Sequence, residues 1–153
     1  MPAVIDTADM DELRAAQKED VSAIVAIDPH RPARPGEIQA LVGEQASLVA
    51  VERGEVVGFA GVKPGHFYRR DFIDLLFVAA SQRRQGVGRA LIQAALRSAS
   101  TSRVFTSTNE SNTPMRELLR AERWTHSGML TGLDEGDPEL VFFHDVANTP
   151  SGS

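Results

Sequence analysis

The segment SQRRQGVGRALIQAAL, residues 81–96, combines positive charge and glycine in a chain whose formal net charge is −5. Three arginines surround a glycine pair: Arg83, Arg84 and Arg89 around Gly86 and Gly88. Glycines allow the backbone to turn sharply and bring successive N–H groups close to a ligand. The residues that follow have the apolar spacing of an amphipathic helix, whose first N–H groups and dipole favour an anion. The pattern predicts a cradle for a pyrophosphate.

Two common phosphate-binding motifs do not fit this segment. A nucleotide-binding P-loop requires a lysine directly after its second glycine, but Arg89 follows Gly88. A dinucleotide fingerprint requires a third glycine where Leu91 stands. A glycine pair by itself leaves a second interpretation open, an ordinary helix start whose arginines are solvated.

Composition narrows the function classes further. The 153 residues suffice for one domain, with 42% hydrophobic and 24% charged residues. The acidic balance argues against nucleic-acid and anionic-membrane partners, and no apolar run has the roughly 20 residues of a membrane span. The first residues lack the basic and apolar regions of a signal peptide, so we expect a cytoplasmic protein. Without cysteine, and with its histidines far apart, the chain is expected to hold no metal.

Hydrophobic periodicity predicts an α/β (α+β) chain with the element order β-α-α-β-β-β-α-β-α-β-β. The predicted strands are 12–16, two within 47–63 around a turn at Gly54, then 72–80, 102–108, 126–133 and 139–146. The predicted helices are 18–27, 36–45, 86–99 and 111–124, the last capped by Asn112. Residues 64–71 are expected to form a loop, and Gly58 and Gly61 are expected to mark a bend, a bulge or a close backbone approach. We expect one domain at 12–146, an N-terminal extension at 1–11 and a flexible tail at 147–153.

Several motifs together resemble one family. Arg83-x-x-Gly86-x-Gly88 follows the strand end Leu76-x-Val78-x-Ala80, which matches the [QR]-x-x-G-x-[GA] signature of the GNAT N-acetyltransferase superfamily, with Ala80 in place of the usual proline. The segments LRAAQKEDVSAIVAI, LVAVERGEVVGFAGV and NTPMRELLRAERW are similar to the family's other conserved segments, in the same order. The resemblance covers about residues 12–146. It implies a GNAT fold, a mixed, mostly antiparallel sheet of about seven strands flanked by helices.

The resemblance also implies acetyl-CoA as the acyl donor, bound where the fourth and fifth strands separate. The backbone of Phe77, Val78 and Ala80 would then pair with the pantetheine. The pyrophosphate would lie on the amides of Arg84, Gln85, Gly86, Val87, Gly88 and Arg89. Arg83 and Arg84 are candidates for the diphosphate or the 3′-phosphate. Asn112 would contact the pantetheine, and its other interpretation, a plain helix cap, is compatible with that contact.

The implied reaction is direct transfer of the acetyl group to a primary amine of a small molecule or a peptide. Asp74 is the candidate base, because a lone carboxylate in an apolar strand retains a proton more readily unless it is paired. A partner from an arginine or from loop amides is the alternative. Asp71 is expected to be a solvated residue at the strand end. Some relatives place a glutamate base on the fifth strand, where this chain has Ser107.

The usual tyrosine acid of the family would fall at Leu119, which cannot donate a proton. Ser111 is a weaker candidate for the acid. Tyr68, the single tyrosine, is a weak candidate for the acceptor site, and an ordinary aromatic residue of the loop is the favoured interpretation. This departure supports an alternative function, a catalytically weak acyl-CoA-binding or regulatory module. The acceptor is expected at 28–37, 64–71 and 132–138, where basic and acidic residues favour neither an anionic nor a cationic amine. The closing strands offer a sheet edge for a homodimer.

Overall fold

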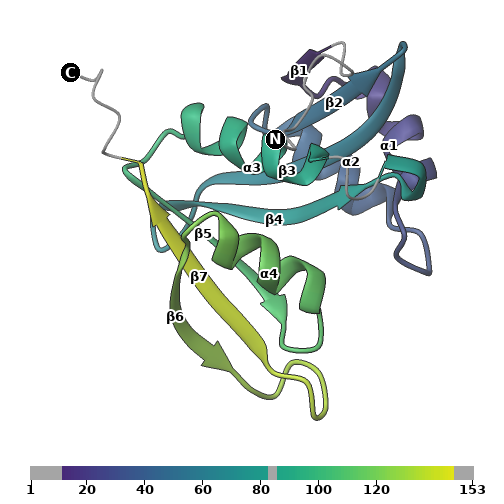
Figure 1. Ribbon diagram of the computed structural model, residues 1–153. Helices are drawn as coiled ribbons and strands as arrows, with labels where there is room; N and C mark the ends of the chain where they lie inside the picture. The colour runs from purple at the N-terminus through teal and green to yellow at the C-terminus, as the bar shows by residue number, and fades with distance from the viewer. Residues whose placement is uncertain (1–11, 83–85, 147–153) are drawn as a thin grey trace. The chain divides into compact units, whose positions relative to one another are not determined.

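The computed structural model describes residues 12–82 and 86–146, and Figure 1 shows their helices and strands. The strands are β1 (Glu12–Ala15), β2 (Leu48–Glu52), β3 (Glu55–Phe67), β4 (Arg70–Val78), β5 (Arg103–Asn109), β6 (Thr125–Leu130) and β7 (Glu139–Asp145). The helices are α1 (Val21–Ile27), α2 (Pro35–Gly43), α3 (Val87–Arg97) and α4 (Thr113–Ala121), with 3₁₀ turns at Lys18–Asp20 and Ala80–Gln82. The predicted element order is confirmed.

The strands form one seven-stranded sheet in the order β1-β2-β3-β4-β5-β7-β6. The pairs β1–β2, β2–β3, β5–β7 and β6–β7 are antiparallel, whereas β4 and β5 are parallel. A parallel pair needs a crossover connection, and α3 supplies it between β4 and β5. The predicted mixed, mostly antiparallel sheet is confirmed.

The chain divides into two compact units. One comprises the chain up to Lys63 together with Asp74–Ser98, and the other comprises Pro64–Ile73 together with the chain from Ala99. The first unit contains β1, β2, α1, α2, α3, β3 up to Lys63 and the last part of β4. The second contains α4, β5, β6, β7 and the hairpin tip between β3 and β4. The domain boundaries at 12 and 146 stay a prediction.

Glycines in β3 let helices of the first unit approach the strand closely. A Cβ at Gly58 would lie 2.9 Å from side-chain atoms of Val87 and Leu91 in α3. A Cβ at Gly61 would lie 2.7 Å from Leu41 of α2. Both separations are shorter than ordinary van der Waals contact, so the two glycines mark close approaches, one of the three outcomes expected for them. The register between β2 and β3 also shifts beside Gly58, between its partner Ala50 and Val51.

We predict that Gly58→Ala lowers the free energy of unfolding by about 1–3 kcal/mol, because α3 must shift to accommodate the added methyl group. Urea denaturation followed by circular dichroism measures the change. Gly36→Ala in the first turn of α2 is the matched control, since an added Cβ there meets no atom within 4 Å. If both variants unfold at the same urea concentration as the unchanged protein, the close packing of α3 on β3 is wrong.

The segment 64–71 is not the predicted loop. Strand β3 continues to Phe67 and β4 begins at Arg70, so the turn consists of Tyr68 and Arg69, with φ of 51° and 68°. Positive φ at both central residues is the geometry of a tight hairpin turn, which asparagine and glycine usually occupy. Pro64 and Gly65 resemble turn residues but lie within the strand, which explains the wrong prediction.

Asp71 is also not the solvated residue that was expected, because only 3% of its surface is exposed. Its carboxylate accepts hydrogen bonds from the Gly65 amide at 2.9 Å and from the Ser100 amide and hydroxyl at 2.8 and 2.7 Å. A buried carboxylate is stable when donors surround it. Asp71 therefore joins the β3–β4 hairpin to the segment before β5 within the second unit.

Candidate active site

In the first unit, β4 is followed by the 3₁₀ turn at Ala80–Gln82, and α3 begins directly after Gly86. The Ala79 amide donates to the Val57 carbonyl at 2.8 Å, which keeps the strand end attached to β3. Gly86 has φ 83° and ψ 5°, a left-handed conformation that glycine adopts without strain. The first helical hydrogen bond of α3 joins the Ala90 amide to the Gly86 carbonyl at 3.0 Å.

The N-terminus of α3 has no side-chain cap from its N-cap residue Gly86. The amides of a first helical turn lack intrahelical acceptors, and with the helix dipole they form an electropositive end. Val87 is buried beneath this turn, whereas Arg89 is exposed. The other predicted cradle residues, Arg83, Arg84 and Gln85, lie outside the described residues.

Asp74, the predicted base, lies on β4 with about a third of its side chain exposed. Its Oδ2 atom is 3.8 Å from Nζ of Lys63 at the edge of an ion pair. The Asp74 carboxylate is therefore only partly buried, and it has a partner. The alternative that a basic side chain pairs with Asp74 describes the structure, but the partner is a lysine and not the expected arginine.

Phe77, a residue expected to contact the donor through its backbone, has a buried ring that packs against Phe59 with 5.5 Å between ring centroids. The Arg34 guanidinium lies over the same ring, 5.9 Å from its centroid. Arg34 comes from the segment between α1 and α2, so this segment is anchored on the end of β4 in the first unit.

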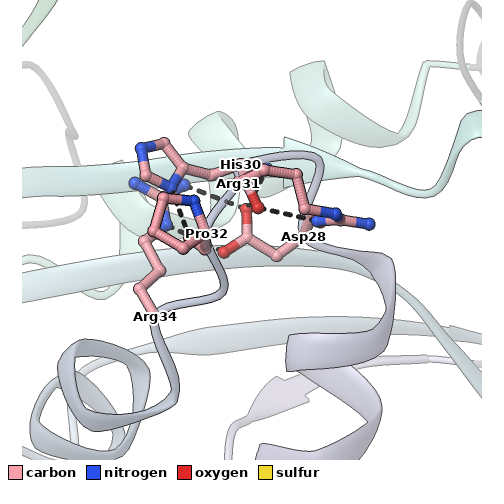
Figure 2. Close-up of polar contacts among 5 residues, drawn as sticks. All are labelled: Asp28, His30, Arg31, Pro32 and Arg34. Carbon is pink, nitrogen blue, oxygen red and sulfur yellow. Dashed lines mark hydrogen bonds and ion pairs between the residues drawn. The ribbon is translucent and has the colours of Figure 1, made fainter.

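Figure 2 shows the polar contacts that shape this segment, which we call the α1–α2 loop (residues 28–34). Asp28 is 1% exposed, and its two carboxylate oxygens accept from Nε and Nη2 of Arg34 at 2.8 and 3.0 Å. The His30 amide donates to the same carboxylate at 3.0 Å. Burial acts to raise the pKa of Asp28, but the hydrogen bonds and positive charge of Arg34, together with the His30 amide, outweigh it and lower the pKa.

The sequence did not reveal this ion pair, because residues 28–37 were expected only to contribute to the acceptor site. One local signal was available, because Asp28 directly follows the last apolar residue of a predicted helix. Solvated aspartates are also common at that position, so the signal does not indicate burial. Nothing in the six-residue spacing to Arg34 indicates burial.

In the second unit, Asn112 is the N-cap of α4 as predicted, and its Oδ1 accepts from the Met115 amide at 3.2 Å. The neighbouring Ser111 hydroxyl donates to Oδ2 of Asp137 at 2.6 Å, and the Ser111 amide donates to Oδ1 at 3.0 Å. Any role of Ser111 as a proton donor to a substrate requires the hydroxyl to leave Asp137.

Two further residues of the second unit bear on the predicted chemistry. The sequence indicated no base on β5, because Ser107 stands where some relatives carry a glutamate. The Ser107 hydroxyl donates to Oε2 of Glu139 at 2.7 Å, so a carboxylate from β7 lies within hydrogen-bond distance of that position. Leu119 is completely buried in α4. Tyr68 is 85% exposed at the hairpin turn, with its ring edge against Phe67.

Within residues 12–82 and 86–146, no three histidine or acidic side chains are grouped so that they could hold a metal ion. In the same part of the chain, no helix is both long and apolar enough to cross a bilayer.

At the position of the [QR]-x-x-G-x-[GA] motif, the left-handed residue Gly86 therefore directly precedes the first turn of α3. The model of the acetyltransferase (GNAT) family matches residues 9–122. The chain belongs to the GNAT acetyltransferase family. The fold class and the family membership predicted from the sequence are thus confirmed.

Solved structures agree with this assignment. A GNAT-family acetyltransferase from Bacillus cereus ATCC 10987 is 30% identical, with a TM-score of 0.81 over 88% of this chain and 96% of that one. Ard1 from Thermoplasma volcanium is 20% identical, with a TM-score of 0.77 over 88% and 96%. The putative acetyltransferase yncA from Salmonella typhimurium, solved with its cofactor acetyl-CoA, is 18% identical, with a TM-score of 0.75 over 90% and 94%. A search of curated proteins found no significant match.

The last two structures share the fold of this GNAT protein and carry no argument about its acceptor. Membership of the family makes the protein a GNAT-family N-acetyltransferase.

Proposed function

We propose that this GNAT protein transfers the acetyl group of acetyl-CoA directly to a primary amine of a small molecule or a peptide. The observation that carries the proposal is the left-handed conformation of Gly86 directly before the N-terminus of α3. An anion is stabilised at such a helix start by backbone N–H groups and by the dipole.

The donor would be held by residues of the strand–turn–helix segment. The amides of Gly86, Val87, Gly88 and Arg89 would bind the pyrophosphate, and Arg83, Arg84 and Gln85 are proposed to extend the cradle. The backbone of Phe77, Val78 and Ala80 would pair with the pantetheine, and Asn112 would contact it in addition to capping α4. Acetyl-CoA suits this segment, because glycine keeps side chains out of the path of a diphosphate.

The proposed reaction needs two proton movements. A carboxylate of the protein takes a proton from the acceptor ammonium, directly or through water, and the free amine attacks the thioester carbonyl. The carbon–nitrogen bond forms and the carbon–sulfur bond breaks. The acylated nitrogen then gives up its second proton as the departing CoA thiolate takes one up, directly or through solvent or a protein donor. A backbone N–H can stabilise the oxyanion that develops on the carbonyl.

Two carboxylates are candidates for the base, and their variants separate them. Asp74 stands on β4 beside Lys63, and Glu139 on β7 accepts from Ser107. We predict that removing the correct one, by Asp74→Asn or Glu139→Gln, lowers kcat about 10²–10⁴-fold while acetyl-CoA still binds. Stopped-flow detection of free thiol, with calorimetry for donor affinity, measures both effects.

Glu55→Gln at the exposed start of β3 is the control for loss of a carboxylate. Unchanged kcat in both the Asp74 and the Glu139 variants would show that neither residue is the base.

The alternative function is a catalytically weak acyl-CoA-binding or regulatory module. The observation that favours it is the buried Leu119 at the position of the usual tyrosine acid, together with the Ser111 hydroxyl held by Asp137. Calorimetric titration with acetyl-CoA and free-thiol release across a panel of amines distinguish the two. Binding with turnover supports the enzyme, binding without turnover supports the module, and absence of binding overturns both.

The homodimer also stays a proposal. Strand β6 is the last strand of the sheet, and Met129 and Leu130 on it are exposed. An outer strand with apolar side chains can pair with another copy. Sedimentation equilibrium tests it, with Met129→Lys expected to shift the mass from dimer to monomer; a monomeric unchanged protein would contradict the proposal.

A further inference from the structure

The α1–α2 loop presents a guanidinium whose charge no carboxylate of the described residues neutralises. We propose that Arg31 binds an anionic group, a carboxylate or a phosphate, on the amine that accepts the acetyl group. The inference rests on the proposed transferase function for the identity of the ligand as acceptor. The anion site itself follows from the hydrogen bonds of the loop.

The two arginines of the loop differ in what they contact. Arg34 uses its Nε–Nη2 edge for both oxygens of Asp28, which is the bidentate geometry that carboxylates and guanidinium groups prefer. Arg31 uses Nη1 alone, which donates to the backbone carbonyls of Asp28 at 2.6 Å and His30 at 2.7 Å. Within residues 12–82 and 86–146, the Nε–Nη2 edge of Arg31 has no acceptor. The edge that binds a carboxylate in Arg34 is therefore available in Arg31.

The charges of the loop leave Arg31 uncompensated. Asp28 is the only acidic residue of the α1–α2 loop. Its charge is neutralised by Arg34, whose Nε lies 2.8 Å from Oδ2 of Asp28. The two carbonyls that hold Arg31 are neutral dipoles, so they orient the guanidinium without cancelling its charge. Arg31 is also exposed, so an incoming anion can reach it.

The loop holds Arg31 in one orientation. The buried Asp28 carboxylate joins the two ends of the loop through Arg34. The His30 ring donates from Nδ1 to the Pro32 carbonyl at 2.9 Å, since a carbonyl can only accept. Arg31 is thus preorganised, and binding an anion costs it little further side-chain freedom.

The loop belongs to the same unit as the proposed donor segment. Arg34 lies over the Phe77 ring near the end of β4, where the pantetheine is proposed to bind. A ligand on Arg31 would therefore be held by a loop that is itself anchored on β4, the strand proposed to bind the donor.

The experiment follows the Nε–Hε resonance of Arg31 by NMR in the full chain. Sodium acetate and sodium phosphate are added in separate titrations at constant ionic strength, and Arg31→Gln assigns the resonance. We expect a saturable shift with at least one anion. Arg97, exposed in the last turn of α3, is the matched arginine and is expected to show only a small, linear shift. An equally small, linear response at Arg31 would overturn the anion site.

Repeating the titrations with saturating acetyl-CoA assigns the site. A saturable shift that persists supports an acceptor site, whereas its loss means that the donor's own phosphates occupy Arg31 and overturns that assignment. Because the anion titration needs no turnover, failure of the proposed transferase function would appear separately, as absence of acetyl-CoA binding in calorimetry.

Kinetics then test the role in substrate choice. The kcat/KM is measured for pairs of amines that differ only by a carboxylate. Arg31→Gln is expected to lower kcat/KM about tenfold or more for the carboxylated amine and to leave the other unchanged, because a charge-assisted bidentate contact is lost. Arg31→Lys keeps the positive charge but not the two parallel N–H donors of the guanidinium, so it is expected to restore part of the kcat/KM for the carboxylated amine. An equal effect on both members would overturn the role in acceptor recognition.

Discussion

Asp28→Asn is expected to lower the free energy of unfolding by about 3 kcal/mol at pH 7, the largest stability effect that we predict. Asparagine has the shape of aspartate but lacks its charge, so it leaves the mostly buried guanidinium of Arg34 without a counter-charge. Asp28 is 1% exposed, and water therefore cannot replace the lost interaction. Chemical denaturation followed by tryptophan fluorescence measures the change.

The effect of this substitution should depend on pH in one direction. The pKa of Asp28 is lowered in the folded protein, so its stabilising contribution is complete above the unfolded pKa of about 4 and is lost as pH falls through the folded pKa. The stability difference between the unchanged protein and Asp28→Asn should be constant from neutral pH to about 5 and shrink below about 4. A difference that grows in acid would contradict the ion pair.

Asp145→Asn is the control, because Asp145 pairs with Arg103 but both side chains are largely exposed. Exposed pairs contribute about 0–1 kcal/mol, so this variant should unfold close to the unchanged protein. Equal losses in the two variants would show that burial of Asp28 contributes nothing.

Gly86→Ala is expected to weaken acetyl-CoA binding about tenfold or more, the largest effect that we predict on donor affinity. The φ of 83° at Gly86 disfavours any residue with a Cβ, and a methyl group at the N-terminus of α3 would also enter the proposed pyrophosphate path. Isothermal calorimetry with acetyl-CoA measures the dissociation constant.

Gly54→Ala is the matched control for this effect. Gly54 has φ 77° in the turn between β2 and β3, and an added Cβ meets no atom within 4 Å. Both variants should lose a similar amount of stability from backbone strain, about 1 kcal/mol, but only Gly86→Ala should lose donor affinity. If Gly86→Ala binds acetyl-CoA as tightly as Gly54→Ala does, the proposed cradle is wrong.

Local signals in the sequence were sufficient for much of the fold. The apolar spacing after Gly88 predicted α3, and Asn112 with Pro114 predicted the start of α4, because caps and helical periods depend on residues a few positions apart. The β3–β4 turn was missed for the opposite reason. Tyr68 and Arg69 are unusual at positive φ, and the pairing of two long strands outweighs their local preference.

The candidate site divides in the same way. The order of elements, the glycine turn before α3 and membership of the GNAT family follow from the sequence by itself, since each depends on residues close together in the chain. The tertiary structure alone decided that Asp28 is buried on Arg34, that Asp71 is enclosed by Ser100 and Gly65, and that Glu139 reaches Ser107. Whether a charged residue is solvated or buried depends on which distant segment packs over it, and no spacing along the chain records that contact.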